Sequence, residues 1–215
     1  MLFGLEWNVP IENRVAVWNT LGNMEEKDHK STQGGVKLIH NYLKLVGDSG
    51  FKILEAESHE EVMKWLLHWS HLVDLKVYPV LEKSVATECI KQSPLVEIKG
   101  KSEAFKDELQ ESSGKMNFIV ECTIPIENRV TVWNAVSNMS KEDGVKILGS
   151  VKVIGKYLTL TGDSGVVFAE SDNFEDMMKW IMNWSHLADM KVYPVLGVSD
   201  AKNCMRQSDL FVKKA

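Results

Sequence analysis

Apolar and polar residues alternate along the chain with two different periods, which predict strands and helices. Residues 3–8 (FGLEWN) and 117–123 (NFIVECT) have the period of two that is typical of a half-buried strand. Pro10 and Glu12 suit the first turn of a helix, which we predict over the residues that follow. Two β-rich runs then flank the sequence GDSG at 47–50, a turn signal that predicts a hairpin.

A second helix is predicted to begin at Ser58, because Ser58 and Glu61 have the spacing of a capping box. A helical period gathers large apolar side chains on one face of this segment. In the first copy of the segment that face holds Val62, Trp65, Leu66, Trp69, Leu72 and Val73. In the second copy it holds Met177, Trp180, Ile181, Trp184, Leu187 and Ala188. We expect Trp69 and Trp184 to be buried in the core.

The elements occur twice because the chain contains a tandem repeat. IENRV stands at 11–15 and again at 126–130, an offset of 115 residues (126 minus 11), and the same offset relates the two copies of GDSG. The offset holds without a gap from Phe3 and Phe118 to Leu95 and Leu210. Such a long, gapless repeat indicates duplication of a whole structural unit.

Each copy is predicted to have the order β-α-β-β-α-β, which is typical of the ferredoxin-like fold. The last strand lies around Pro79 or Pro194, near an edge or a bulge. We predict an α+β protein with ferredoxin-like repeats at 1–96 and 116–215, joined by a polar linker at 97–115. The two sheets are expected to face each other across an approximate two-fold axis, as a pseudo-dimeric α+β barrel with the helices outside.

Composition narrows the class of partner. The hydrophobic fraction is 44% and the net charge is −5, without a basic cluster, which argues against nucleic-acid binding. No apolar run approaches the length of a membrane span, and no signal-peptide pattern is seen, so neither a membrane nor secretion is expected. Cys89, Cys122 and Cys204 form no CxxC pair and no disulfide framework, which favours a cytoplasmic location.

The strongest candidate site lies on the sheet face that points away from the predicted helices. Strand alternation places Glu6 and Glu121 on that face, and Glu55 and Glu170 interrupt apolar β-rich runs. A carboxylate inside a barrel needs a hydrogen-bond partner or a ligand. The predicted ligand-binding residues are Glu6, Glu121, Glu55, Glu170, Tyr78 and Tyr193. A structural hydrogen bond, or exposure at an open rim, is the alternative interpretation of these carboxylates.

Other polar groups fit known chemistry less well. Ser70 and His71 are neighbours on a predicted helix and diverge, so they do not form a hydrolase triad with Asp74. His68 and His71 have the spacing of a metal-binding pair, but Asn183 stands in place of His68 in the second copy. We therefore predict no metal site and no catalytic triad.

The order of motifs resembles an uncharacterised bacterial domain family, the domain of unknown function number 3303. The motifs are PIENRV, a GxSGxxxxEs hairpin, a WxxxWSxL helix and a closing xVYPVL, and they occur in both repeats. The resemblance implies a place in the dimeric α+β barrel superfamily, and it supplies no established activity.

That superfamily includes monooxygenases, haem-degrading enzymes and small-molecule isomerases. The resemblance therefore leaves two alternatives to a small-molecule-binding or protein-interaction role, for which we expect no cofactor. One is a monooxygenase- or isomerase-like enzyme that uses the four predicted glutamates as acids and bases. The other is a haem-binding protein that uses Asn8, Trp65 or Trp69, and His71. The sequence leaves open whether the chain forms a homo-oligomer.

Overall fold

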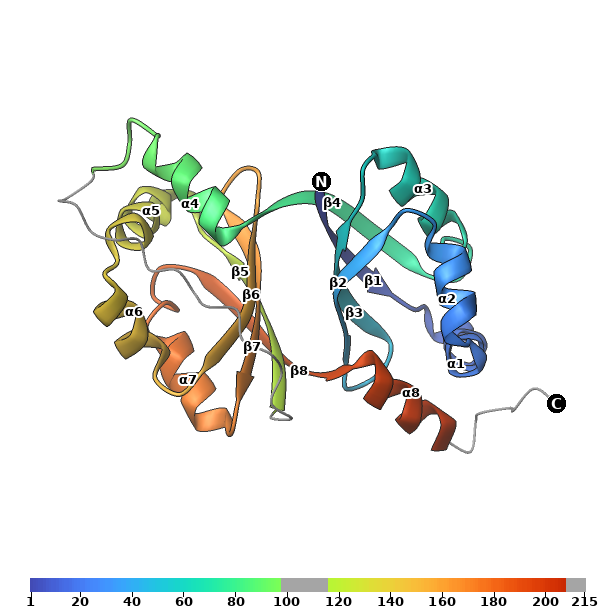
Figure 1. The fold of residues 1–215 in the computed structure, drawn as a ribbon. Coiled ribbons are helices and arrows are strands. Elements are labelled where there is room, and N and C mark those ends of the chain that lie inside the picture. Colours follow the sequence, from blue (N-terminus) through green and yellow to red (C-terminus); the bar gives the residue numbers. More distant parts are fainter. Residues whose placement is uncertain (98–115, 208–215) are drawn as a thin grey trace. The chain divides into compact units, whose positions relative to one another are not determined.

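The computed structural model describes residues 1–97 and 116–207 of the chain (Figure 1). The predicted linker at 97–115 lies, except for Glu97, outside the described residues. The chain divides into two compact units, unit 1 with Met1–Pro79 and the segment from Val195, and unit 2 with Val80–Pro194. No helix among the described residues has the length and apolar character that crossing a membrane requires.

In unit 1 an antiparallel sheet carries its helices on one face (Figure 1). Strand β3 lies between β1 and β2, and β4 pairs with the other edge of β1. The elements of this part of the chain are β1 (Leu2–Asn8), a 3-10 turn (Ile11–Asn13), α1 (Arg14–Asn23), α2 (Glu26–Gln33), β2 (Lys37–Lys44), β3 (Ser49–Glu55), α3 (His59–Leu67) and β4 (Asp74–Glu82).

Unit 2 repeats this arrangement, with β7 between β5 and β6. The elements of the rest of the described chain are α4 (Lys83–Lys91), β5 (Met116–Thr123), a 3-10 turn (Ile126–Asn128), α5 (Arg129–Asn138), α6 (Lys141–Leu148), β6 (Lys152–Thr159), β7 (Ser164–Ser171), α7 (Phe174–Met182), β8 (Asp189–Gly197) and α8 (Val198–Gln207).

The two repeats exchange their C-terminal ends. Strand β4 pairs with β1 of unit 1 up to Pro79, and its last residues, Val80–Glu82, pair with β6 of unit 2. The last residues of β8, Val195–Gly197, pair with β2 of unit 1. Helix α4 consequently packs on α5 in unit 2, and α8 packs on α1 in unit 1. The compact units therefore do not coincide with the sequence repeats.

The predicted fold class is confirmed. The strand order β1-β3-β2-β8-β5-β7-β6-β4 closes on itself as a barrel built from two βαββαβ repeats. The alternation in β1 also has the predicted sense, because Phe3 and Leu5 are buried against Val62 and Trp65 of α3. In unit 2 the same cluster contains Phe118, Val120, Met177 and Trp180.

Two details differ from the sequence-based expectations. Helices α2 and α6 were not predicted, and α3 ends at Leu67, so Trp69 follows the helix. The backbone N–H of Trp69 donates to the carbonyl of Leu66 (2.9 Å), which closes a tighter turn than an α-helical one. The prediction that Trp69 and Trp184 are buried core is therefore wrong, because both side chains are only half-buried.

Candidate functional site

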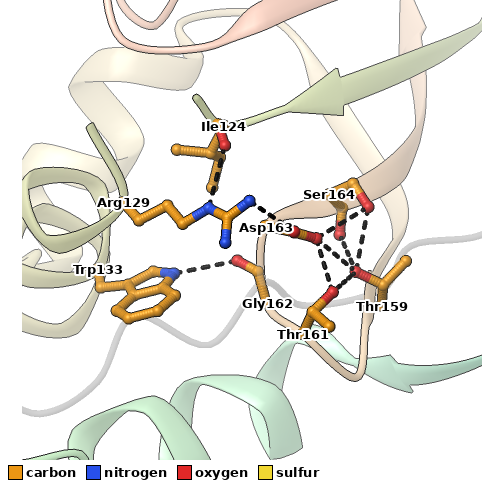
Figure 2. Close-up of polar contacts among 8 residues, drawn as sticks. All are labelled: Ile124, Arg129, Trp133, Thr159, Thr161, Gly162, Asp163 and Ser164. Carbon is orange, nitrogen blue, oxygen red and sulfur yellow. Dashed lines mark hydrogen bonds and ion pairs between the residues drawn. The ribbon is translucent and has the colours of Figure 1, made fainter. Parts of the chain in front are cut away.

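The motifs that define the repeat hold the hairpin turn against the first helix. In Figure 2 an Nη atom of Arg129 forms an ion pair with Asp163 (2.8 Å), and its Nε donates to the carbonyl of Ile124 (3.4 Å). The indole N–H of Trp133 donates to the carbonyl of Gly162 (3.0 Å). Gly162 has a φ of 65°, in the region that favours glycine, so the conformation of the turn favours glycine at this position.

Unit 1 contains the same arrangement, which we call the turn clamp (Arg14, Trp18, Gly47 and Asp48, with the copy described above). Arg14 pairs with Asp48 (2.8 Å), and the Trp18 indole donates to the carbonyl of Gly47 (2.9 Å). The arginine of PIENRV and the aspartate of GDSG thus form the same ion pair in both repeats. Their recurrence is explained by folding, and the prediction that GDSG forms a hairpin turn is confirmed.

Three hydroxyl groups surround Asp163 in unit 2, whereas in the described part of unit 1 the Ser49 hydroxyl donates to Asp48 (3.0 Å). Thr161 donates to its Oδ1 (2.6 Å), and Thr159 and Ser164 make longer bonds to the same atom (3.3 and 3.4 Å) (Figure 2). The hydrogen bond from Thr161, with the charge of Arg129, lowers the pKa of Asp163. Lys44 and Val46 occupy the positions of the two threonines in the first repeat.

The structure gives two of the predicted glutamates the expected tyrosine partners. The Tyr78 hydroxyl donates to Glu6 Oε1 (2.8 Å), and the Tyr193 hydroxyl donates to Glu121 Oε2 (3.4 Å). All four side chains are partly buried. Each pair lies on the sheet face away from the helices, as alternation predicted for the glutamates. The ligand site on that face stays a prediction.

The other two glutamates form ion pairs with lysines directly opposite on the neighbouring strand. Glu170 is fully buried and lies 3.5 Å from the Nζ atom of Lys152. Glu55 is exposed and pairs with Lys37 (3.1 Å). The equivalent positions therefore have different environments, and Glu55 is a surface residue.

The residues that would bind haem by resemblance are not brought together. Asn8 is exposed and lies on the sheet face opposite Trp7 and Trp65, and His71 is exposed in the turns after α3. Within residues 1–97 and 116–207 there is no group of three or more His, Cys, Asp or Glu side chains that could hold a metal ion. No histidine lines the helix-side cavities described below, so these cavities do not fit a haem with a histidine axial ligand.

A cavity of about 150 Å³ lies between the sheet and the helices of unit 2. Its walls are apolar and come from α5, α6 and the segment that begins with α7, with α4 at one side. The apolar lining includes Val132, Val136, Met139, Ile147, Leu148, Trp180 and Trp184. Trp184 is only half-buried because its side chain lines this space.

Lysines are the charged side chains among the residues that line the unit 2 cavity. Lys156 comes from β6 and Lys83 from the start of α4. Cys122 lies on the sheet beneath the cavity, and burial raises the pKa of its thiol to about 11, against a smaller opposite effect of Lys156. The thiol is therefore protonated at neutral pH, and the positive charge of the site belongs to the lysines.

Unit 1 has two adjoining cavities of about 50 and 40 Å³ in the corresponding place. Both are lined by Trp7, Lys52, Trp65 and Trp69. The Lys52 Nζ atom lies 5.8 Å from the ring centre of Trp7 and 5.2 Å from that of Trp65. Burial lowers the pKa of Lys52 to about 8. An amine in an aromatic, poorly hydrated site is the group that sequence reasoning missed.

The alternation of side chains along the strands could have predicted that Lys52 and Lys156 face the helices. Lys52 has the same parity as the fully buried Leu54, so alternation alone directs it toward the helices. The repeats carry this lysine on different strands, because Lys52 pairs with Asn41 across β2 and β3, whereas Lys156 pairs with Val167 across β6 and β7. The two cross-strand pairs are equivalent in the repeats. The lysine is on β3 in the first pair and on β6, the equivalent of β2, in the second.

Comparison with solved structures agrees with the fold. A mutant chlorite dismutase from Candidatus Nitrospira defluvii is similar, with a TM-score of 0.54, 11% sequence identity and coverage of 96% of each chain. A protein described as a dyp-type peroxidase from Shewanella oneidensis is similar with a TM-score of 0.53, 8% identity and coverage of 94% of each chain. At these identities the likeness concerns the fold alone.

Comparison at the sequence level gives the family. No curated protein sequence matches the chain. The sequence model of the family described as domain of unknown function (DUF3303) matches residues 1–93 and 116–209, once in each repeat. The chain therefore belongs to the DUF3303 family, of which it carries two copies in tandem.

Proposed function

We propose that the protein binds a small organic anion in the cavity of unit 2. The observation that carries this proposal is an apolar space that Lys156 borders from the sheet. An apolar cavity of roughly 150 Å³ accommodates benzene in another protein, so the ligand would have about the size of one aromatic ring with an acidic group.

The physical terms favour such a ligand. Burial of one aromatic ring contributes roughly 2 kcal/mol. A carboxylate near Lys156 gains from the weakly polar surroundings, and Lys83 adds positive charge at the side where α4 borders the cavity. After the cost of association, a dissociation constant on the order of 0.1–1 mM is expected for a probe as small as benzoate.

Ligand-observed NMR with benzoate and benzyl alcohol tests the proposal, because the two probes have similar rings and differ in charge. Lys156→Met should weaken benzoate binding about tenfold or more and leave benzyl alcohol nearly unchanged. Lys141→Met, at an exposed lysine on α6, is the matched control. Equal benzoate affinities of the wild type and Lys156→Met would overturn the proposal, as would a wild-type protein that binds neither probe.

A second proposal keeps a predicted ligand site in each unit, on the sheet face away from the helices. The repeated pairs Glu6–Tyr78 and Glu121–Tyr193 support it, because each carboxylate is held by a hydroxyl at the same repeat position. We expect a double Glu6→Gln, Glu121→Gln variant to lose a ligand that co-purifies from the native host, as measured by native mass spectrometry. His71→Ala should keep that ligand, and retention by the glutamine variant would count against the site.

A further inference from the structure

Lys52 is unusual among the described lysines, because burial lowers its pKa and the structure gives it neither a hydrogen bond nor an ion pair. Its ammonium group contacts aromatic rings, which compensate a buried charge weakly. Two polar atoms at the same cavities are also without partners in the described part of the chain. These are the Asn41 Oδ1 atom and the Trp7 Nε1 atom, both buried. Unsatisfied buried polar groups beside a cavity point to a ligand that satisfies them.

We propose that Lys52 is a nucleophilic amine that condenses with a small aldehyde or ketone in the unit 1 cavities to form an imine. The proposal concerns the other unit and does not depend on the anion proposed for unit 2. The two adjoining spaces, of about 50 and 40 Å³, have room for a ligand of a few non-hydrogen atoms.

The amine has the properties that this reaction needs. Only the neutral amine attacks a carbonyl carbon, and burial lowers the pKa of Lys52 to about 8. The other ionisable group that lines the larger cavity is Lys202 of α8, which carries the same sign of charge. Desolvation, and to a smaller extent the charge of Arg206, lowers the pKa of Lys202. Among the described lining residues no carboxylate is present to keep Lys52 protonated.

The condensation balances without a further reactant. The Lys52 lone pair forms a C–N bond as the carbonyl π electrons move to oxygen, and transfer of the amine proton to that oxygen gives a carbinolamine. The hydroxyl then takes a second proton and leaves as water, and the nitrogen lone pair forms the C=N bond of the iminium ion. The Lys202 ammonium can supply this second proton, and the Trp7 indole N–H can donate a hydrogen bond to the oxygen.

Reductive trapping of the full chain tests the proposal. The protein is incubated at pH 7 with propanal and sodium cyanoborohydride for short times, and peptide mass mapping then locates the propylated lysines. Lys52 should react at least about tenfold faster than Lys141, because a far larger fraction of its amine is neutral. Its rate should rise with pH and level off above about pH 8. Without the reductant the adduct should disappear on dilution, since an imine hydrolyses.

Two variants complete the test. Lys52→Arg keeps the charge and should lose the rapid adduct, whereas Lys156→Met should leave the labelling of Lys52 unchanged. Because labelling is mapped on the wild-type protein, the result does not depend on the folding of a variant. A Lys52 that reacts no faster than Lys141 would overturn the proposal, and so would a rapid adduct that persists in the absence of reductant.

Discussion

At the residue scale, the buried lysine of unit 1 should make stability depend on pH. The folded-state pKa of Lys52 is about 8, below the ordinary value of 10.5, so the unfolded chain binds the extra proton first as pH falls. Wild-type stability should therefore increase between pH 8 and 10.5, by up to about 3 kcal/mol. Lys52→Met should be more stable than the wild type at pH 7 and should lack this increase.

Urea unfolding at several pH values measures this effect, because the difference between wild type and variant isolates Lys52 from other titrating groups. Lys141→Met serves as the control, since Lys141 is exposed. A wild-type stability that stays parallel to that of Lys52→Met from pH 7 to 10.5 would show that the amine titrates normally.

The carboxylate of the turn clamp should have the opposite dependence on pH. The pKa of Asp163 is lowered by Thr161 and Arg129, so its stabilisation is present above the ordinary aspartate pKa and is lost as pH falls through the folded-state value. Asp163→Asn should cost about 1 kcal/mol at pH 7, since the ion pair is partly exposed, and much less at pH 2 to 3. Chemical unfolding of both proteins, with Asp189→Asn as an exposed control, measures the difference.

At the element scale, strands were predicted from alternation more reliably than helix ends. The alternation in β1 correctly assigned Phe3 and Leu5 to the helix side and Glu6 to the other face. Helix α2 was missed because EKDHKSTQ has no apolar stripe, and its start depends on a local capping box at Glu25. The end of α3 was missed because the apolar spacing continues past Leu67 into turns that still pack inward.

The candidate site was only partly predictable for a related reason. Parity assigned Glu6 to the sheet face away from the helices, and the structure gives it Tyr78, one of the expected ligand-site residues, as its hydrogen-bond partner. The helix-side cavities depend on which helix covers each sheet, and α8 reaches unit 1 through the exchange of chain ends. No local pattern in the sequence around Lys52 indicates that contact.

The hairpin of β2 and β3 should not tolerate a side chain at Gly50. A Cβ atom there would lie 2.2 Å from the Tyr42 carbonyl oxygen and 2.6 Å from the Trp7 ring. Gly50→Ala should therefore destabilise unit 1 by more than about 2 kcal/mol. Gly197→Ala is the control, because the nearest atom there is 3.8 Å away. Thermal unfolding compares the two, and equal melting temperatures would contradict the close packing.

At the scale of the whole molecule, the exchange of chain ends predicts how the protein responds to a cut. A protease site placed within residues 98–115 divides the chain between the repeats. Unit 1 then still needs α8 from the C-terminal fragment, and unit 2 needs α4 from the N-terminal one. The fragments should co-elute in gel filtration after cleavage and separate only in denaturant. Separation under native conditions would contradict the exchange.

The same exchange has a genetic consequence. A gene that contains two independent domains can lose one of them and still encode the other. Here a deletion of either copy would remove most of one unit and also one helix of the other, because α4 and α8 each serve the unit built mostly by the other repeat. We therefore expect both copies to be retained together, although their interiors differ: unit 1 has the tryptophan-lined amine of Lys52, and unit 2 has the apolar space beside Lys156.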